Sequence, residues 1–212
     1  MMFIPTVYTP GVDIKNNKVG LSETKLHHIK NVLRIRENSD INISNGKGHI
    51  MFGTLKKDFV LIDNIKEFQK PNDIKIFIPF LREKNRFRYL IEKLVELNAS
   101  EIHIGETQNT QKNNIKSEKI ESWVVSAIEQ SGSPFYPNII YTKYIDFDLF
   151  DTCFDISGQQ ISNHTKNISN FAIGPEGGWS KEELKNFKFK FMLTEFNLRS
   201  ETAAITALSL IM

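Results

Sequence analysis

Hydrophobic positions in the first 70 residues come in short runs that are typical of β-strands. The runs read FIPTVY, INIS, HIMFGTL and FVLI, and the dipeptide Asn45-Gly46 is a favoured hairpin turn. One helical stretch interrupts them, because Ser22 is a suitable N-cap and apolar residues recur after it at helical spacing. Those apolar residues are Leu26, Ile29 and Leu33. The pattern predicts a small β-rich domain over residues 1–70.

From residue 71 onward, strand-like and helix-like patterns alternate. IKIFIPFL is followed by helical spacing over 86–98, then by the strand SEIHIG and a helix over 117–130. The short runs PNIIY, CFDIS, FAIG and FMLT predict further strands, and Asn98 is a candidate left-handed C-cap. Such alternation predicts an α/β domain with a mainly parallel sheet over residues 71–212.

The last predicted helix, ETAAITALSLIM, carries no charged residue after Glu201. A helix that is apolar all round must be buried on most sides. Either a partner subunit covers it, which would make the protein a homodimer, or it is the central helix of a monomeric domain. The pattern leaves both open.

Composition narrows the class of protein. Hydrophobic residues make up 40% and charged residues 25%, as in ordinary globular proteins. No apolar run approaches the length needed to span a membrane and the first residues do not read as an export signal, so we expect a cytoplasmic protein without membrane segments. The single cysteine, Cys153, excludes an intramolecular disulfide and is expected to be a core thiol. The five histidines lack ligand spacing with carboxylates, so we expect no metal site.

Positive charge is concentrated in the first domain. Residues 1–70 hold 11 Lys and Arg against 7 Asp and Glu, whereas the remainder holds 16 against 18. A polar and basic stripe on the predicted helix and just beyond it could contact the phosphates of a polyanion, although a lysine-rich surface can also be merely solvated. Its members are His27, Lys30, Asn31, Arg34 and Arg36.

The segment FAIGPEGGWSKEEL (171–184) predicts a strand, a glycine-rich loop and a helix with a capping box from Ser180 to Glu183. Glycines there allow the backbone to approach a ligand closely. The spacing matches neither the dinucleotide fingerprint nor a Walker loop, and Glu176 argues against a phosphate guest. A neutral or cationic ligand fits better, and a plain turn is the alternative.

A second polar segment, Arg199 to Thr202 in LRSETA, precedes the apolar helix. Glu201 or Ser200 could simply cap the helix while Arg199 pairs with a neighbour. The same groups could instead form part of a site.

Both segments together resemble the SPOUT methyltransferases, and specifically the bacterial family that methylates N3 of a uridine in 16S ribosomal RNA. The resemblance covers nearly the whole chain and also includes LHHIKNVLRI (26–35), KLVELNASEIHI (93–104) and WVVSAIEQSG (123–132). It implies a C-terminal SPOUT trefoil-knot α/β domain preceded by a small PUA-like β-barrel domain. It further implies a homodimer, S-adenosyl-L-methionine (SAM) as cofactor, and 16S ribosomal RNA or the small ribosomal subunit as partner.

Carried over by position, the resemblance implies which residues form the site. Loss of the N3 proton in such a reaction requires a base or an anion stabiliser nearby, so Arg199 could stabilise the uracil anion and Glu201 could accept the proton directly or through water. The residues expected to bind or border the cofactor are Ser157, Gly158, Ile173, Gly174, Gly178, Leu193, Leu198 and Ser200.

The chain departs from the family's usual pattern at several positions. Arginines common in the family are absent from ETQNTQ (106–111) and at Ser133, and Thr194 and Phe196 replace a glycine and an arginine. Two other functions therefore stay open. One is a SPOUT enzyme acting on another RNA site, such as a ribose 2′-hydroxyl, and the other is a non-catalytic RNA-binding or ribosome-assembly protein.

Overall fold

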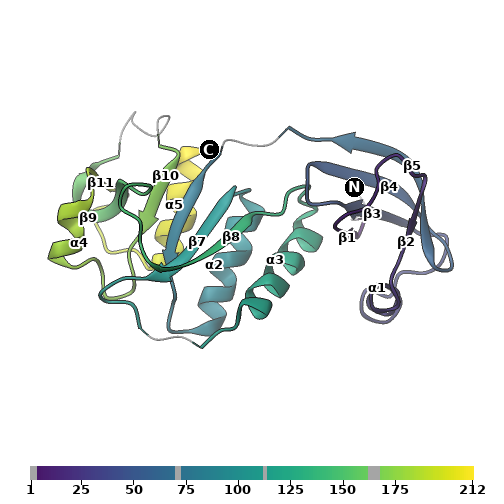
Figure 1. Cartoon of the computed structure of the whole chain (residues 1–212), viewed down its shortest axis with the longest axis horizontal. Coiled ribbons are helices and arrows are strands. Elements are labelled where there is room, and N and C mark those ends of the chain that lie inside the picture. Colours follow the sequence, from purple (N-terminus) through teal and green to yellow (C-terminus); the bar gives the residue numbers. More distant parts are fainter. Residues whose placement is uncertain (1–3, 70–72, 112–113, 162–167) are drawn as a thin grey trace. The chain divides into compact units, whose positions relative to one another are not determined.

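The computed structural model describes residues 4–69, 73–111, 114–161 and 168–212 (Figure 1). The chain divides into two compact units. The first comprises Met1–Lys70 with Val125–Tyr136, and the second comprises Pro71–Val124 with Pro137–Met212.

The first unit contains a five-stranded sheet in the order β1-β3-β4-β5-β2. Its strands are β1 (Thr6–Tyr8), β2 (Lys18–Gly20), β3 (Asp40–Ser44), β4 (His49–Leu55) and β5 (Phe59–Glu67). β1 pairs with β3 in parallel and the other pairs are antiparallel. The predicted hairpin at Asn45-Gly46 lies between β3 and β4, and Gly46 has a φ of 71°, a conformation that favours glycine.

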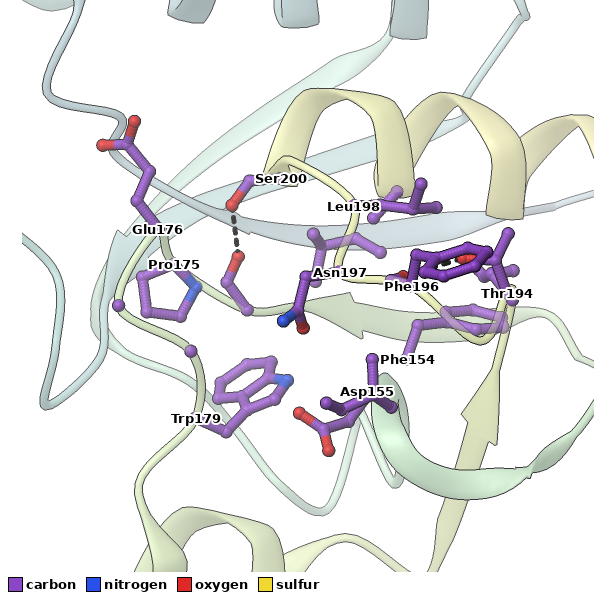
Figure 2. A pocket seen from close by; sticks show the side chains of 17 residues that line it. Phe154, Asp155, Pro175, Glu176, Trp179, Thr194, Phe196, Asn197, Leu198 and Ser200 are labelled. Carbon is purple, nitrogen blue, oxygen red and sulfur yellow. Dashed lines mark hydrogen bonds between the residues drawn. The ribbon is translucent and has the colours of Figure 1, made fainter.

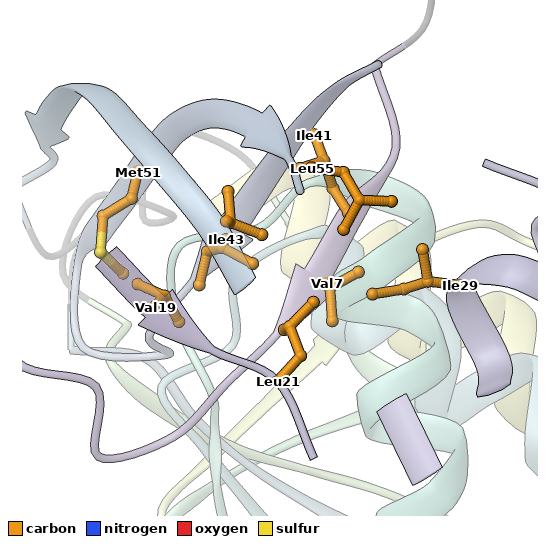
Figure 3. Packing of buried hydrophobic residues seen from close by; sticks show 9 residues of the cluster. Val7, Val19, Leu21, Ile29, Ile41, Ile43, Met51 and Leu55 are labelled. Carbon is orange, nitrogen blue, oxygen red and sulfur yellow. The ribbon is translucent and has the colours of Figure 1, made fainter. Parts of the chain in front are cut away.

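Apolar side chains from these strands form one core (Figure 3). Val7, Ile41, Ile43 and Met51 contribute to it, and Ile29 joins from the helical segment with no exposed surface. Residues 125–136 belong to the same unit. Glu129 accepts a hydrogen bond from the Tyr8 backbone N–H at 3.1 Å, and Ser44 Oγ donates to the Ser133 carbonyl at 2.8 Å.

The helical segment of this unit differs from the prediction. Ser22 caps α1 (Glu23–His27) as expected, but a π-helical turn, η1 (His28–Val32), follows, and Arg34 has a φ of 55°. Because the helix ends at Val32 and its spacing changes in the π-turn, Leu33 is 38% exposed instead of facing the core. Arg34 therefore does not continue a helical stripe from His27 and Asn31.

The second unit contains a six-stranded sheet in the order β11-β9-β10-β6-β7-β8, and all its pairings are parallel. The strands are β6 (Lys75–Pro79), β7 (Glu101–Glu106), β8 (Asn138–Tyr144), β9 (Thr152–Gln160), β10 (Asn170–Ile173) and β11 (Phe189–Met192). The predicted parallel α/β architecture is confirmed.

Four helices accompany this sheet along the chain: α2 (Lys84–Glu96), α3 (Ser117–Ser131), α4 (Lys181–Asn186) and α5 (Ser200–Ile211). α2 and α5 pack against each other. Asn98 follows α2 with a φ of 54°, which confirms the predicted left-handed C-cap, and α4 has the predicted capping box between Ser180 and Glu183. Cys153 is fully buried, as expected of a core thiol.

The strand β9 carries a large irregularity. Lys190 of β11 lies opposite Cys153, but the next residue, Phe191, lies opposite Gln159. On the other side, β10 pairs with β9 only at Cys153 and Phe154. Residues 155–158 are consequently left out of both ladders, and they bulge from the sheet near the carboxyl ends of its strands.

Within the described parts of the chain, no helix is long and apolar enough to cross a membrane. No cluster of three or more His, Cys, Asp or Glu that could hold a metal ion occurs among those same residues.

Candidate functional site

A pocket of about 390 Å³ opens beside three neighbouring strands, β9, β10 and β11 (Figure 2). Its walls come from residues 154–156 of β9, the end of β10 with the glycine-rich loop that follows it (173–179), and the loop after β11 (193–194 and 196–198). Ser200 and Ala203 of α5 complete it. The carboxyl ends of parallel strands are where α/β sheets commonly bind ligands.

The glycine-rich loop is shaped by a tight turn. The Gly178 backbone N–H donates to the Pro175 carbonyl at 2.8 Å, and Gly178 has a φ of 72°. A Cβ on Gly174 would lie 3.0 Å from Nε1 of Trp179, so the indole packs where a side chain would be. Asn109 supports the loop from outside, because its Nδ2 donates to the Gly178 carbonyl at 2.9 Å.

One hydrogen bond joins the two motif segments directly. Ser200 Oγ donates to the Gly174 carbonyl at 2.7 Å, and Ser200 is buried (Figure 2). The start of α5 is thereby fixed against the glycine-rich loop, and the two form adjoining walls of one pocket.

Arg86 of α2 binds two carboxylates, one from each of these two segments. Its Nε and Nη2 donate to the Glu201 carboxylate at 2.8 and 2.6 Å, and its Nη1 donates to Glu176 of the glycine-rich loop. Glu176 also accepts the backbone N–H of Arg82 at 3.1 Å. The guanidinium of Arg86 therefore connects α2 with the start of α5 and with the glycine-rich loop.

The electrostatics of this network fix its protonation. The hydrogen bonds from Arg86 to Glu201 hold the pKa of the guanidinium above its ordinary value, although burial opposes this. Burial acts to raise the pKa of Glu201, but hydrogen bonds from Arg86 and from its own backbone, with the positive charges of Arg86 and Arg199, lower it overall. Glu201 is therefore a paired carboxylate and a weak base.

The pocket offers a fitting environment for a polar, cationic ligand. Trp179 lines the pocket, and its Nε1 is buried without a hydrogen-bond partner among the described residues. The charged side chains in the described lining are Asp155 and Glu176, and both are acidic. This agrees with the expectation of a neutral or cationic guest.

Two protein-family models match this chain and together cover most of its length. A model of an RNA methyltransferase domain matches residues 68–212, and a model of an RNA methyltransferase PUA domain matches residues 21–63. The chain belongs to this RNA methyltransferase family. The resemblance seen in the sequence is thereby confirmed at the level of family and fold, namely a PUA-type sheet followed by a parallel α/β SPOUT domain.

Individual relatives are distant but match over nearly their full lengths. Ribosomal RNA small subunit methyltransferase E of Buchnera aphidicola is 27% identical, over 97% of this chain and 94% of the relative. The enzyme of the same name from Rickettsia conorii is 25% identical, over 92% and 89%. A Legionella pneumophila methyltransferase solved with bound SAM has the same fold, with a TM-score of 0.85, 23% identity, and coverage of 99% and 97%.

Six of the eight residues that the sequence suggested for the cofactor line this pocket of the methyltransferase domain. They are Ile173, Gly174, Gly178, Leu193, Leu198 and Ser200. The structure does not bring Ser157 and Gly158 to it. These two lie at the far end of the β9 bulge and line a separate cavity. A Cβ on Gly158 would lie 2.5 Å from the Lys190 carbonyl carbon of β11. Gly158 is there to let two strands approach.

The two residues suggested for catalysis occupy different environments. Arg199 is exposed at the N-cap of α5, between the pocket residues Leu198 and Ser200, without lining the pocket itself. Glu201 is 8% exposed and faces Arg86, away from the lining.

The five residues suggested for RNA binding are all exposed in the first unit. His27 ends α1, Lys30 and Asn31 lie in η1, and Arg34 and Arg36 follow it. Lys30 Nζ also donates to the Lys57 carbonyl at 3.0 Å.

Sequence reasoning missed Arg86, Asp155 and Trp179. Arg86 lies 115 positions before Glu201, and nothing local signals that contact. Asp155 enters the pocket only because of the β9 bulge. Trp179 directly follows the glycine pair, so the motif itself could have marked it as a wall of the pocket.

Proposed function

We propose that this protein uses SAM to methylate N3 of a specific uridine in 16S ribosomal RNA. The observation that carries the proposal is the pocket in which the glycine-rich loop and the start of α5 meet through the hydrogen bond from Ser200 to Gly174. Two relatives that match 92% and 97% of this chain are named as ribosomal RNA small subunit methyltransferases, which supports the choice of RNA.

The pocket residues fit SAM in size and chemistry. Drug-sized ligands occupy cavities of roughly 300–1,000 Å³, which includes this one. Loop backbone groups at Ile173, Gly174 and Leu198 offer donors and acceptors for a purine, and the acidic lining suits a cation. When bound, SAM supplies an electrophilic methyl group that is transferred to the uracil nitrogen as its proton is lost.

Arg199 is the candidate catalytic residue. Arg199 is exposed and lies between the pocket residues Leu198 and Ser200, so its guanidinium is the candidate to stabilise the negative charge that develops on uracil as the N3 proton leaves. Glu201 is a positioning residue instead of the proton acceptor, because Arg86 already occupies its carboxylate and lowers its pKa.

Kinetics of Arg199→Ala test this role. We expect kcat to fall by about 10²- to 10³-fold, the usual effect of losing a group that stabilises an anionic transition state, while the SAM dissociation constant stays within about twofold. Arg199→Lys should recover part of the rate. Undiminished turnover in Arg199→Ala would refute the assignment.

RNA docking is assigned to the first unit. Its exposed cations Lys30, Arg34 and Arg36 and its polar side chains His27 and Asn31 suit contacts to phosphates, which position RNA without reading its sequence. The PUA-type match over residues 21–63 includes all five positions and supports this role.

The protein is further proposed to act as a homodimer. α5 buries Ala204, Ala207 and Leu208 within its own unit, yet Leu210 and Met212 at its end remain 47% and 55% exposed. A helix that carries no charge beyond its first turn and exposes two apolar side chains near its end is suited to contact a partner's surface there.

Nucleoside mass analysis of 16S ribosomal RNA, transcribed in vitro and treated with the protein and SAM, tests the reaction itself. Assembled small subunits lacking the modification form a second substrate. The proposal expects N3-methyluridine in at least one of them. A methyl group on ribose would favour a 2′-hydroxyl target, and no methylation of either substrate despite SAM binding would favour a non-catalytic RNA-binding protein.

A further inference from the structure

Of the two acidic residues in the described lining of the pocket, Glu176 has a cationic partner and Asp155 has none among the described residues. Glu176 shares the guanidinium of Arg86, whereas Asp155 makes no ion pair among the residues that the structure describes. Its Oδ1 accepts the Ser157 backbone N–H at 2.9 Å and Ser157 Oγ at 2.6 Å. These bonds orient the carboxylate without neutralising it.

The irregular strand pairing places Asp155 in the pocket. β10 pairs with β9 up to Phe154, and β11 leaves β9 after Cys153, so Asp155 is the first residue outside both ladders. Figure 2 shows its carboxylate on the side of the pocket near Trp179 and Asn197. Arg86 shares one positive charge between Glu176 and Glu201, so that group of three keeps about one negative charge, and Asp155 adds another that faces no cation among the described residues.

The cofactor and its product differ by one unit of charge. At neutral pH, SAM carries an ammonium, a sulfonium and a carboxylate, for a net charge of about +1, and removal of the methyl group leaves S-adenosylhomocysteine with a net charge of about 0. A carboxylate in a partly enclosed pocket attracts the first more than the second, even without direct contact, because Coulomb attraction there is less screened than in water.

We propose that Asp155 is a specificity-determining residue that makes the pocket prefer cationic SAM over neutral S-adenosylhomocysteine. Methyl transfer itself removes the charge that Asp155 attracts, so this residue assists product release. This inference rests on the proposed function, because it takes the pocket as the SAM site.

The test is calorimetric titration of wild type and Asp155→Asn with SAM, S-adenosylhomocysteine and sinefungin, an analogue whose protonated amine keeps a positive charge in place of the sulfonium. Asparagine retains an oxygen that can accept both hydrogen bonds from Ser157. We expect SAM and sinefungin to bind about fivefold more weakly to the variant, and S-adenosylhomocysteine to change by less than about twofold.

Asp148→Asn is the matched control. Asp148 is exposed in the same unit, lies outside this pocket and makes no ion pair among the described residues. The Asp148→Asn variant loses the same amount of charge as Asp155→Asn, but outside the pocket. The affinities for all three ligands should therefore stay within about twofold of wild type.

A second measurement needs no variant. Raising the ionic strength from about 0.05 M to about 0.5 M should reduce the wild-type preference for SAM over S-adenosylhomocysteine, because salt screens the carboxylate. Equal weakening of all three ligands in Asp155→Asn would show a hydrogen-bonding role and overturn the inference, as would a preference independent of salt. Failure of wild type to bind any of the three would instead refute the proposed function.

Discussion

Arg86 shows how much a single residue organises in this site. Its side chain is 22% exposed, and it pairs with the side chains of Glu201 and Glu176, which are 10% and 25% exposed. Without the guanidinium, the carboxylates of Glu176 and Glu201 would repel each other at partly buried positions. Removing one partner of such a network costs far more than the intact network contributes.

Arg86→Met should accordingly destabilise the protein. We expect the free energy of unfolding to fall by about 2–3 kcal/mol, somewhat below the cost for fully buried pairs because these groups are partly hydrated. Urea denaturation measures it. Arg88→Met is the control on the same helix, since Arg88 is 50% exposed in an i,i+4 pair with Glu92, and its loss should cost less than about 1 kcal/mol.

The same network predicts a pH dependence of stability. The folded pKa of Glu201 lies below its ordinary value of 4.5, so its contribution is complete above that value and is lost as the pH falls through the lower folded pKa. The difference in unfolding free energy between wild type and Arg86→Met should therefore shrink between about pH 5 and pH 3. A difference that stays constant over this range would show that Glu201 does not gain its stability from the pair.

At the scale of elements, the β9 bulge decides which residues reach the pocket. Residues 155–158 leave the ladders and then return to β11 at Gln159. The return requires close strand approach at Gly158, where a Cβ would meet the Lys190 carbonyl carbon at 2.5 Å, the carbonyl oxygen at 2.6 Å and the Phe191 nitrogen at 2.6 Å. These are backbone atoms, so relief requires movement of a strand.

Gly158→Ala should destabilise the protein by about 1–3 kcal/mol, the usual cost of overpacking, as measured by urea denaturation. Gly20→Ala is the matched control, because Gly20 also lies in a strand and nothing lies within 4 Å of an added Cβ there. Gly20→Ala lowers the conformational entropy of the unfolded chain as Gly158→Ala does, but it creates no clash in the folded protein. Equal effects at the two positions would contradict the proposed strand contact.

The elements that could be predicted from the sequence are those set by local periodicity. The six strands and the helices of the second unit follow from apolar spacing, and the family resemblance, carried over by position, gave six of the pocket residues. The rest depends on contacts that are not local. Alternation does not encode the register jump that separates Asp155 from Gly158, and spacing does not reveal the π-turn that exposes Leu33.

At the scale of the whole molecule, the family match assigns an RNA methyltransferase domain and a PUA domain to one chain, so docking and chemistry are expected to be divided between units. α3 contributes to both units, since its residues up to Val124 group with the second and those from Val125 with the first. The chain therefore passes from the proposed catalytic unit to the proposed RNA-docking unit within α3.

The proposed homodimer predicts a measurable mass. Sedimentation equilibrium should give twice the 24.5 kDa of one chain. Leu210→Lys should shift the protein toward monomer, because it would bury a charge in the apolar contact, whereas Tyr144→Lys, at a residue 62% exposed on the edge strand β8, should not. A wild-type protein that stays monomeric at micromolar concentration would contradict the dimer.

The most direct test of the central claim is calorimetric titration of the purified protein with SAM. It examines the glycine-rich loop and the start of α5 together without requiring the RNA substrate. The proposal predicts one binding event per chain with a micromolar dissociation constant, which corresponds to roughly −8 kcal/mol. Absence of binding, both alone and in the presence of 16S ribosomal RNA, would contradict a SAM-dependent methyltransferase.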